Sequence, residues 1–307
     1  MQKIVIIHNP TAGSADHSKN FLMNLVDKSL LEIEYISTKE EAWKEYRLGD
    51  EDLILLAGGD GTVRKLFEKM LDAKWEEKRT GPQVVLLPLG KANNISKTLN
   101  IKGKPNRKII YNANNAVWYN YGNIEGLKEE NFFIESMGFG VFPQLLSIMK
   151  DLKTNNEAPE IKIKLALEHL IKVVKNYPPV TVEIKVEGIN IEGSFLLAEL
   201  MKIKHIGPNL QLAPHGAIND ECFYLILITE GKREAFIRYL SSKLENKHKT
   251  ENINDFAICI QTKKAKIKAK APQLHIDDNL LENYSGKYMD ISIKRGVFTF
   301  IENIKYP

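Results

Sequence analysis

The sequence predicts an α/β N-terminal domain with a doubly wound, mainly parallel sheet, followed by a mainly antiparallel β-sandwich domain. Three observations support this fold class. In roughly the first third of the chain, short apolar runs alternate with stretches of helical period, which is typical of a parallel sheet covered by helices. Polar loops that contain glycine follow several of these runs. From about Val117 onward the segments become shorter and are of β type.

Strands of the first domain are predicted where apolar residues run almost without interruption. These runs cover residues 3–8, 52–57 and 83–87, and residues 32–36 alternate as a strand should. An apolar stripe at helical spacing follows the first run over residues 21–30, and another follows the third run over residues 63–71. Thr38 and Glu41 have the spacing of a capping box, so a helix is expected to open at Thr38.

The second domain is predicted from segments of β type at residues 117–121, 130–136, 180–186, 189–200, 222–228, 263–270 and 288–293. One helix is expected among them, over residues 160–176, because a proline precedes it directly and another follows its end. The period of two in a strand places Ala265, Ile267 and Ala269 on one face and the lysines Lys264, Lys266, Lys268 and Lys270 on the other. One face of this strand should therefore be solvated and basic.

Composition is that of a globular chain. The 307 residues are 43% apolar and 27% charged, which excludes a disordered or collagen-like chain. No apolar run approaches the roughly 18 residues that a membrane helix needs, and the opening apolar run is too short for a signal peptide, so a cytoplasmic location is expected. Cys222 and Cys259 have neither zinc-site nor redox spacing and are expected to be packed thiols.

Positive charge is concentrated in residues 232–270, which hold 11 Lys/Arg against 4 Asp/Glu. The rest of the chain is then slightly acidic, because the whole chain carries a formal charge of only +4. A solvated surface accounts for this patch, and the alternative is peripheral contact with an anionic membrane surface. No nucleic-acid partner is expected.

A glycine-rich loop, Gly58-Gly59-Asp60-Gly61-Thr62, lies between the third predicted strand and its helix. Backbone N–H groups and the positive end of the helix dipole meet at such a point, so a phosphate is expected there. Thr62 is expected to cap the helix or to contact a phosphate oxygen. Asp60 would repel an anion unless it faces Mg²⁺, a metal-bound water or a hydroxyl group. A tight turn whose glycines serve geometry alone is the alternative.

Two further polar loops follow predicted strands. Residues 9–13 (NPTAG) close the first strand, and residues 88–94 (PLGKANN) close the fourth. In a doubly wound sheet the loops at the carboxyl ends of the strands share one edge, where ligands bind. The three loops should therefore face one crevice, although turn chemistry explains each loop taken alone.

These loops resemble the motifs of the diacylglycerol kinase catalytic-domain family, which includes bacterial lipid kinases and sphingosine kinases. NPTAG is similar to the family's first nucleotide motif, GGDGT to its hallmark, and LGKANN resembles its GTxND loop. Residues 138–142 (GFGVF) and 213–220 (APHGAIND) resemble two later segments, so the likeness spans nearly the whole chain. The resemblance implies a kinase that uses ATP and Mg²⁺ to phosphorylate a lipid alcohol.

The resemblance also implies which residues bind the nucleotide. They are Asn9, Pro10, Thr11, Gly13, Thr38, Gly58, Gly59, Asp60, Gly61, Thr62, Gly90, Lys91 and Asn93. A structural Mg²⁺ is implied at Asp220, together with the backbone carbonyls of Ala217 and Cys222. Without the resemblance, Asp220 reads as an Asx-type turn residue.

The predicted catalytic residues depart from the family pattern. The family's proton acceptor lies in a DGE triplet, and the corresponding residues here are Asp277, Asp278 and Asn279, whose amide cannot accept that proton. Candidate catalytic residues are Asp60, Asp277 and Asp278, with either Asp278 or Asp60 as the base. His275, on the same predicted strand as Asp277, is expected at the surface, where it could contact substrate.

Two rivals to a lipid kinase remain open. The first is a protein that binds nucleotide and lipid without efficient turnover, which Asn279 favours, as does Asn94 in place of the Asp of the GTxND loop. In the same loop Lys91 replaces Thr and would add positive charge near the phosphates. The second rival is an NAD kinase, which shares GGDGT, although NPTAG and APHGAIND favour the lipid branch.

The expected organisation follows from these assignments. Residues 1–124 form an ATP-binding domain, and residues 125–295 form a domain that receives the lipid substrate. The resemblance further suggests that the last strand, within residues 296–307, packs back on the first domain.

Overall fold

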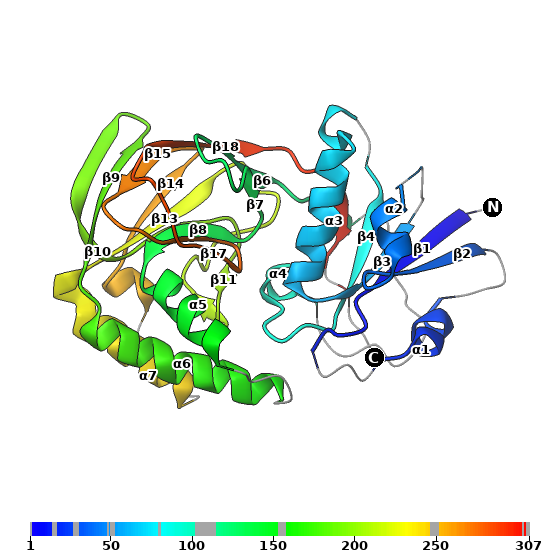
Figure 1. The fold of residues 1–307 in the computed structure, drawn as a ribbon, viewed down its shortest axis with the longest axis horizontal. Helices are drawn as coiled ribbons and strands as arrows, with labels where there is room; N and C mark the ends of the chain where they lie inside the picture. The colour runs from blue at the N-terminus through cyan, green and yellow to red at the C-terminus, as the bar shows by residue number, and fades with distance from the viewer. Residues whose placement is uncertain are drawn as a thin grey trace. The chain divides into compact units, whose positions relative to one another are not determined.

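The computed structural model describes residues 2–13, 17–26, 31–47, 49, 53–78, 81–101, 115–152, 158–245, 252–302 and 304. The chain divides into two compact units (Figure 1). Unit 1 comprises Met1–Tyr119 and Arg295–Pro307, and unit 2 comprises Asn120–Lys294. Unit 1 therefore takes residues from both ends of the chain, whereas unit 2 is one continuous segment.

The sheet of unit 1 is parallel over its first four strands. β1 (Gln2–His8) pairs with β2 (Leu31–Ser37) and with β3 (Leu53–Gly58), and β3 pairs with β4 (Gln83–Pro88). The strand order is β2-β1-β3-β4-β19-β5, so the direction of winding reverses between β1 and β3. Doubly wound sheets bind ligands at this reversal, outside the carboxyl ends of the strands.

The far edge of this sheet is closed by the end of the chain. β19 (Thr299–Ile301) runs parallel to β4 and antiparallel to β5 (Ala116–Trp118). Phe300 in this strand and Phe298 just before it are fully buried. Their rings contact the ring of Tyr119, with centroids 5.3 and 6.2 Å away. These aromatic contacts attach the last strand to unit 1.

Helices connect the strands of unit 1. They are α1 (Lys19–Asn24), α2 (Glu41–Glu45), α3 (Asp60–Asp72) and α4 (Asn94–Thr98), with a 3₁₀ turn at Trp75–Glu77. The apolar stripe of α3 is buried as predicted, because Val63, Leu66, Phe67 and Met70 have no exposed surface. Parts of two predictions, residues 27–30 of the first helix and residue 52 of the third strand, lie outside the described residues.

The predicted capping box is wrong. The helix α2 starts at Glu41, and its N-cap residue is Glu40, whose side chain makes no cap. Ser37 shapes the preceding turn instead, because its hydroxyl accepts from the Lys39 N–H at 3.3 Å and its carbonyl accepts from the Glu40 N–H at 3.2 Å. Local side-chain bonds of this kind compete with helix formation. Thr38 is thereby left outside the helix.

Unit 2 is built on one large antiparallel sheet. Its strands are β6 (Tyr121–Glu125), β7 (Phe132–Phe133), β8 (Ser136–Gly140), β9 (Val180–Val186), β10 (Ile189–Met201), β13 (Phe223–Thr229), β14 (Ile258–Thr262), β15 (Lys264–Ala269), β16 (Leu274–Ile276), β17 (Asn279–Leu281) and β18 (Met289–Lys294). A small separate ladder joins β11 (His205–Ile206) to β12 (Leu210–Gln211).

The long strand β10 makes this sheet curl. Its first half pairs with β9, and its second half pairs with β8 and β13. The pairing with β13 shifts register between Phe195 and Leu197, and such a bulge bends a strand. The predicted sandwich is therefore a single curled sheet, in which the strands that enclose the core are continuous with one another.

The prediction of one helix in this half is wrong. The structure has three in its described part of unit 2: α5 (Val141–Asp151), α6 (Pro159–Asn176) and α7 (Arg233–Leu244). They pack on one side of the sheet, where a second apolar cluster forms. The helix α7 buries Phe236, Tyr239 and Leu240, which are spaced three and four residues apart as on one face of a helix. This spacing was present in the sequence, but it lay within the charge-rich segment, so the helix was not predicted.

Two surface predictions meet different outcomes. In β15, Ala265, Ile267 and Ala269 are buried and the alternating lysines point outward, as the period of two predicts. Both cysteines are free, but Cys259 is exposed, so the prediction of a packed thiol is wrong there.

No helix among the described residues is long and apolar enough to cross a membrane.

Candidate functional site

Three loops meet at the carboxyl edge of the unit 1 sheet. The backbone N–H of Asn9 donates to the Ala57 carbonyl at 2.9 Å, and the Asn9 side-chain amide donates to the Thr62 hydroxyl at 3.3 Å. The Leu89 N–H donates to the Gly58 carbonyl at 2.9 Å. These contacts join the loops after β1, β3 and β4, so the structure brings together the three segments that the sequence singled out.

Glycines allow the loops to approach closely. A Cβ atom on Gly59 would lie 2.7 Å from the Cα of Gly90, and one on Gly13, whose φ is +56°, would lie 2.2 Å from the Leu89 carbonyl oxygen. Gly61 differs, because a Cβ atom there would meet no other atom within 4 Å. The first turn of α3 therefore borders open space at Gly61, with its N–H groups at the positive end of a helix of 13 residues.

Asp60 holds two of these loops together. Its carboxylate oxygens accept from the backbone N–H groups of Asn94 and Ile95, each at 3.0 Å, and the side chain is only 9% exposed. The carboxylate thus caps the short helix α4 from a different segment of the chain. Thr62 is not a cap, because the N-cap of α3 is Gly59 and Thr62 lies inside the helix.

Asn93 stabilises the third loop. It adopts a left-handed backbone with φ of +52°, its side-chain oxygen accepts from the Gly90 N–H at 2.9 Å, and its amide donates to the Gly90 carbonyl at 2.8 Å. The neighbouring Lys91 is exposed. Asn93 therefore fixes the backbone of the loop, and Lys91 carries the positive charge.

Thr38 presents a polar atom that the fold leaves unsatisfied. Its backbone N–H donates to the His8 carbonyl at 2.8 Å, which places it at the carboxyl end of β2 next to β1. Its side chain is 8% exposed, and the hydroxyl has no hydrogen-bond partner among the described residues. A buried hydroxyl without a partner is costly and suggests a ligand group at this position.

A histidine pair behind the first loop was missed by the sequence analysis. The Nε2 atom of His17 lies 3.1 Å from the Ala12 carbonyl, His17 Nδ1 lies 2.8 Å from His8 Nε2, and His8 Nδ1 lies 2.7 Å from the Tyr35 hydroxyl. Burial, with a further contribution from His17, lowers the pKa of His8 to about 4. The contacts depend on residues far apart in the sequence, so no motif announced them.

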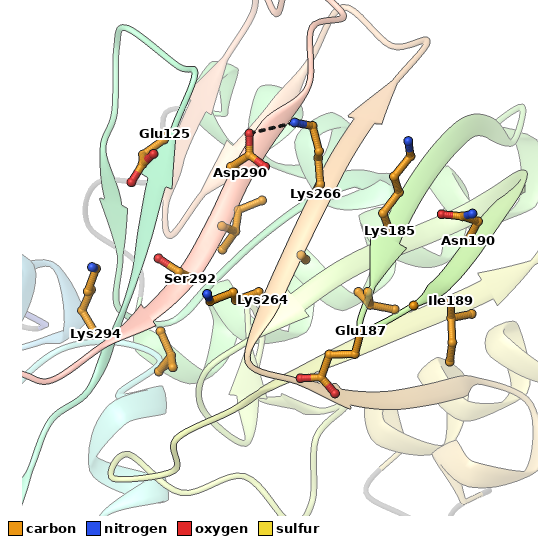
Figure 2. Close-up of a pocket in the computed structure, with 15 residues that line it drawn as sticks. Glu125, Lys185, Glu187, Ile189, Asn190, Lys264, Lys266, Asp290, Ser292 and Lys294 are labelled. Atoms are coloured by element: carbon orange, nitrogen blue, oxygen red, sulfur yellow. Dashed lines mark hydrogen bonds and ion pairs between the residues drawn. The ribbon is translucent and has the colours of Figure 1, made fainter.

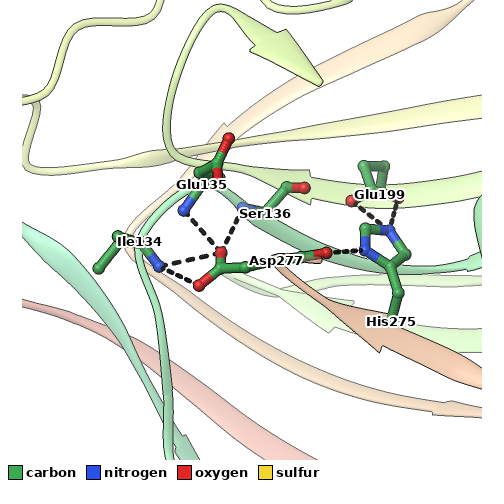
Figure 3. Close-up of polar contacts among 6 residues, drawn as sticks. All are labelled: Ile134, Glu135, Ser136, Glu199, His275 and Asp277. Atoms are coloured by element: carbon green, nitrogen blue, oxygen red, sulfur yellow. Dashed lines mark hydrogen bonds and ion pairs between the residues drawn. The ribbon is translucent and has the colours of Figure 1, made fainter. Parts of the chain in front are cut away.

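In unit 2, Asp277 occupies a cradle of backbone amides (Figure 3). Its carboxylate accepts from the N–H groups of Ile134, Glu135 and Ser136 at 2.7 to 3.2 Å, and its own N–H donates to the Ser136 carbonyl at 2.7 Å. Asp277 is 6% exposed and has a φ of +50°, in the two-residue turn between β16 and β17. The carboxylate therefore anchors the hairpin to the segment before β8.

The prediction of a surface histidine is wrong. His275 is 1% exposed, with Nδ1 2.9 Å from the Asp277 carbonyl and Nε2 3.0 Å from the carboxylate of Glu199, which is fully buried (Figure 3). Burial alone would lower the pKa of His275, but the charge and hydrogen bond of Glu199 outweigh it and raise the pKa. Both ring nitrogens of His275 therefore face oxygen acceptors.

The tip of this hairpin also carries exposed polar groups. Asp278 and Asn279 are both exposed. The Asn279 amide donates to the Glu130 carboxylate at 2.8 Å, and Glu130 comes from the connection between β6 and β7. A carboxylate therefore lies beside the amide of Asn279, and no sequence motif pointed to it.

Two of the predicted Mg²⁺ ligands, Asp220 and the Ala217 carbonyl, already have partners within the protein. The Asp220 carboxylate accepts from the Ala217 N–H at 2.8 Å and from the Tyr224 hydroxyl at 3.0 Å. The Ala217 carbonyl accepts from the Nζ of Lys202 at 2.9 Å. The described residues also contain no group of three or more His, Cys, Asp or Glu side chains that could hold a metal. The structural Mg²⁺ implied by the resemblance does not fit these residues.

A basic groove of about 620 Å³ runs along the outer face of the unit 2 sheet (Figure 2). Lys185, Lys264 and Lys294 line it, together with Lys266, which forms an ion pair with Asp290 at 3.1 Å. Glu125 and Glu187 also line the groove, so its charges are mixed. The lysines are solvated, and carboxylates lie among them.

Comparison with known proteins agrees with the arrangement of the three loops. Residues 3–116 match the family model of the diacylglycerol kinase catalytic domain. A diacylglycerol kinase of Bacillus subtilis (strain 168) is 26% identical over 303 residues, which cover 94% of this chain and 90% of that protein.

Solved structures share the fold over nearly the whole length. A diacylglycerol kinase of Bacillus anthracis str. Sterne superposes with a TM-score of 0.64 at 16% identity, and a candidate diacylglycerol kinase of the same organism superposes with a TM-score of 0.70 at 19% identity. Each match covers 98% of this chain and 97% of the other. The predicted fold class, a parallel α/β part followed by an antiparallel β part, is confirmed. Residues 3–116 are therefore similar to the diacylglycerol kinase catalytic domain, and the family resemblance drawn from the motifs is confirmed.

Proposed function

We propose that the protein is an ATP-dependent lipid kinase that transfers the γ-phosphoryl group to the hydroxyl of a diacylglycerol-like or sphingoid lipid. The observation that carries the proposal is the meeting of three loops at one sheet edge, beside the open space at Gly61 and the unsatisfied hydroxyl of Thr38. The family of the domain supplies the reaction class, and the relative from B. subtilis bears the name of a kinase of this class.

The loops have distinct roles in this proposal. The backbone N–H groups of Gly59 to Gly61 and the dipole of α3 bind phosphate, and the glycines allow the anion to approach the main chain. The Thr38 hydroxyl bonds a polar group of the nucleotide, and Lys91 adds positive charge. Bound Mg²⁺ would neutralise charge on the phosphates. Asp60 acts indirectly, because it positions the loop that carries Lys91.

The chemical step requires a proton acceptor at the lipid hydroxyl. The lipid oxygen forms a bond to the γ-phosphorus, the bond from that phosphorus to the bridging oxygen breaks, and ADP leaves. The hydroxyl proton passes to a carboxylate. Asp277 is poorly suited because backbone amides occupy its oxygens, so the more accessible acids of the same hairpin region, Asp278 and Glu130, are the candidates. Such base catalysis contributes roughly 10²- to 10⁴-fold to a rate.

Unit 2 is proposed to receive the lipid, and the basic groove is proposed as a peripheral contact with anionic membranes. Three of its cations, Lys185, Lys264 and Lys294, have no carboxylate partner among the described residues. A surface lysine contributes only about 1 kcal/mol at an anionic membrane. The contact should therefore be weak and should depend on salt.

Phosphate transfer from labelled ATP tests the proposal. The acceptors are diacylglycerol, sphingosine and ceramide, in neutral and in anionic vesicles, with NAD offered in a parallel reaction. Transfer to a lipid is expected, and it should be faster on anionic vesicles. Transfer to NAD would instead support an NAD kinase. Binding of ATP without transfer to any acceptor would favour the non-catalytic alternative, and equal rates on both vesicles would remove the membrane contact.

Two variants test where the nucleotide binds. Gly61→Ala adds a methyl group into the open space and should raise the KM for ATP by about 10-fold with an unchanged fold. Thr38→Val should raise the KM for ATP by about 2- to 10-fold, because it removes one hydrogen bond to the nucleotide. Gly231→Ala is the control, because a Cβ atom there also meets nothing within 4 Å. Unchanged ATP kinetics in Gly61→Ala would place the nucleotide elsewhere.

A further inference from the structure

A lysine is completely buried at the end of β10. Lys202 has no exposed surface, and its Nζ donates to the carbonyls of Ala217 and Ile218, each at 2.9 Å. Both acceptors are carbonyl oxygens, and Asp220 lies near enough for its charge to favour the ammonium form of the side chain. An isolated buried ammonium is very costly, and it persists only where oxygen atoms replace its water shell.

The turn around Asp220 is organised about this ammonium. Its carbonyls at residues 217 and 218 point to Lys202, and the carbonyl of Asn219 accepts from the Asn120 side chain at 2.9 Å. The Asp220 carboxylate is held by the Ala217 N–H and by the Tyr224 hydroxyl. Converging carbonyl dipoles and a nearby carboxylate form a cation site, and here a side chain fills it.

The same lysine is linked to the hairpin of the candidate catalytic residues. The Lys202 N–H donates to the Glu135 carbonyl at 2.8 Å, and the Glu135 N–H donates to the Asp277 carboxylate at 2.7 Å. One residue therefore connects the Asp220 turn to the turn at Asp277. A change at Lys202 should be felt in the packing of both turns.

We propose that the ammonium of Lys202 is the permanent cation of this turn and that it takes the place of a structural divalent metal, so that unit 2 folds and remains folded without one. The chain needs a divalent ion at most for its nucleotide. The proposal does not depend on the reaction that the protein catalyses, because it concerns the folded state of unit 2.

Thermal unfolding of the nucleotide-free full-length protein tests this proposal. The unfolding midpoint of the wild type should be the same in EDTA and in millimolar Mg²⁺ or Ca²⁺. Mn²⁺, followed by electron paramagnetic resonance, should find no site that Asp220→Asn removes. A midpoint that falls in EDTA, or a Mn²⁺ site lost in Asp220→Asn, would overturn the proposal. Both measurements need only the wild type and Asp220→Asn, so they remain decisive if Lys202 variants do not fold.

Substitutions separate a cation position from ordinary packing. Lys202→Met keeps the chain length without the charge and should lower the midpoint by about 5 °C or more, because the carbonyls and Asp220 lose their buried partner. Lys263→Met is the matched control, since Lys263 pairs with Glu221 at 3.3 Å on the surface of the same region, and it should change the midpoint by about 1 °C or less.

A smaller side chain should convert the position into a metal site. Lys202→Ala leaves a space bounded by the Ala217 and Ile218 carbonyls, so Mg²⁺ or Ca²⁺ should raise the midpoint of this variant. The rise should disappear in the double variant Lys202→Ala/Asp220→Asn. A Lys202→Ala protein whose midpoint ignores divalent cations would contradict the proposal that Lys202 fills a cation site.

Discussion

At the level of single residues, Asn279 at the hairpin pairs its amide with a carboxylate from another segment of the chain. Asn279 cannot accept a proton, but its amide holds the Glu130 carboxylate at 2.8 Å. Asp277 keeps the identity that the motif predicted, yet three backbone amides bind its carboxylate. The two carboxylates therefore differ, because Asp277 holds the hairpin in place whereas Glu130 belongs to the β6–β7 connection and bonds to Asn279.

We expect Glu130 to be the proton acceptor of the proposed reaction. Glu130→Gln should lower kcat for lipid phosphorylation by about 100-fold or more, with little change in the KM for ATP or in stability. Asp277→Asn should instead lower stability by about 1–3 kcal/mol, because its amide group would face N–H donors. Steady-state kinetics and urea unfolding measure both effects.

Glu125→Gln is the control for this experiment, since Glu125 is exposed at the end of the neighbouring strand β6. Full activity of Glu130→Gln together with a large loss in Asp278→Asn would assign the proton acceptor to Asp278.

At the level of elements, the loop after β1 rests on a chain of hydrogen bonds whose direction can be worked out. The Ala12 carbonyl can only accept, so His17 must carry its proton on Nε2. Neutral His17 then accepts at Nδ1 from His8 Nε2–H, and His8 accepts at Nδ1 from the Tyr35 hydroxyl. Every hydrogen bond of this series can form with both imidazole rings neutral. The series links β1 and β2 to the loop at residues 9–13.

This chain should make unit 1 sensitive to acid. The pKa of His8 is about 4 in the folded protein, against an ordinary value of 6.5. Neutral His8 therefore contributes its full share to the free energy of unfolding above pH 6.5. This share is lost as the pH falls toward 4, because His8 in the unfolded chain binds a proton at a higher pH than in the folded protein. The groups that face it are His17 and Tyr35, and the Lys19 ammonium lies 4.6 Å from the Tyr35 ring centroid. The loss should reach about 3 kcal/mol at most.

Urea unfolding of the wild type at pH 7 and at pH 5 measures this loss. His8→Gln should be less stable at pH 7 but should lose less on acidification, because the side chain no longer titrates. His169→Gln, in helix α6 of unit 2, should behave like the wild type. Equal acid sensitivity of the wild type and His8→Gln would show that other groups govern the response.

The elements also show which parts of the fold the sequence could predict. Buried strands of unit 1 are continuous apolar runs, so their positions were predicted to within a residue or two. The loops that follow them were predicted as one site because the topology brings strand ends together. The helices α5 and α7 were missed, since the first follows a strand directly at Gly140 and the second lies in a charged segment.

Partners distant in the sequence explain the remaining errors about the site. Asp60 and Asn94 are 34 residues apart, and Lys202 and Ala217 are 15 apart, yet each pair is joined by a hydrogen bond. No local pattern records such contacts. The sequence could therefore predict which residue types gather at the site, but it could not predict which of their polar atoms were already occupied.

At the level of the whole molecule, the hydrophobic cores follow the division into two units. Among the described residues, two apolar clusters lie wholly in unit 2 and another lies wholly in unit 1. Unit 1 is closed by the end of the chain, because β19 pairs with β4 and β5. The three tryptophans of the chain, Trp43, Trp75 and Trp118, all belong to unit 1. Tryptophan fluorescence therefore reports on unit 1, whereas far-UV circular dichroism reports on both units.

These facts predict two separable unfolding transitions. Phe300 is fully buried, and its ring lies 5.3 Å from that of Tyr119 and 5.1 Å from that of Phe298. Phe300→Ala should lower the free energy of unfolding of unit 1 by about 3–5 kcal/mol. The fluorescence transition should therefore move to a lower urea concentration. Ile267 lies in the core of unit 2, so Ile267→Ala should leave the fluorescence transition unchanged. It should move only the part of the circular dichroism transition that reports the unfolding of unit 2. If Ile267→Ala moved the fluorescence transition as far as Phe300→Ala does, the two units would unfold in one cooperative transition. A substitution in either unit would then change the stability of the whole chain.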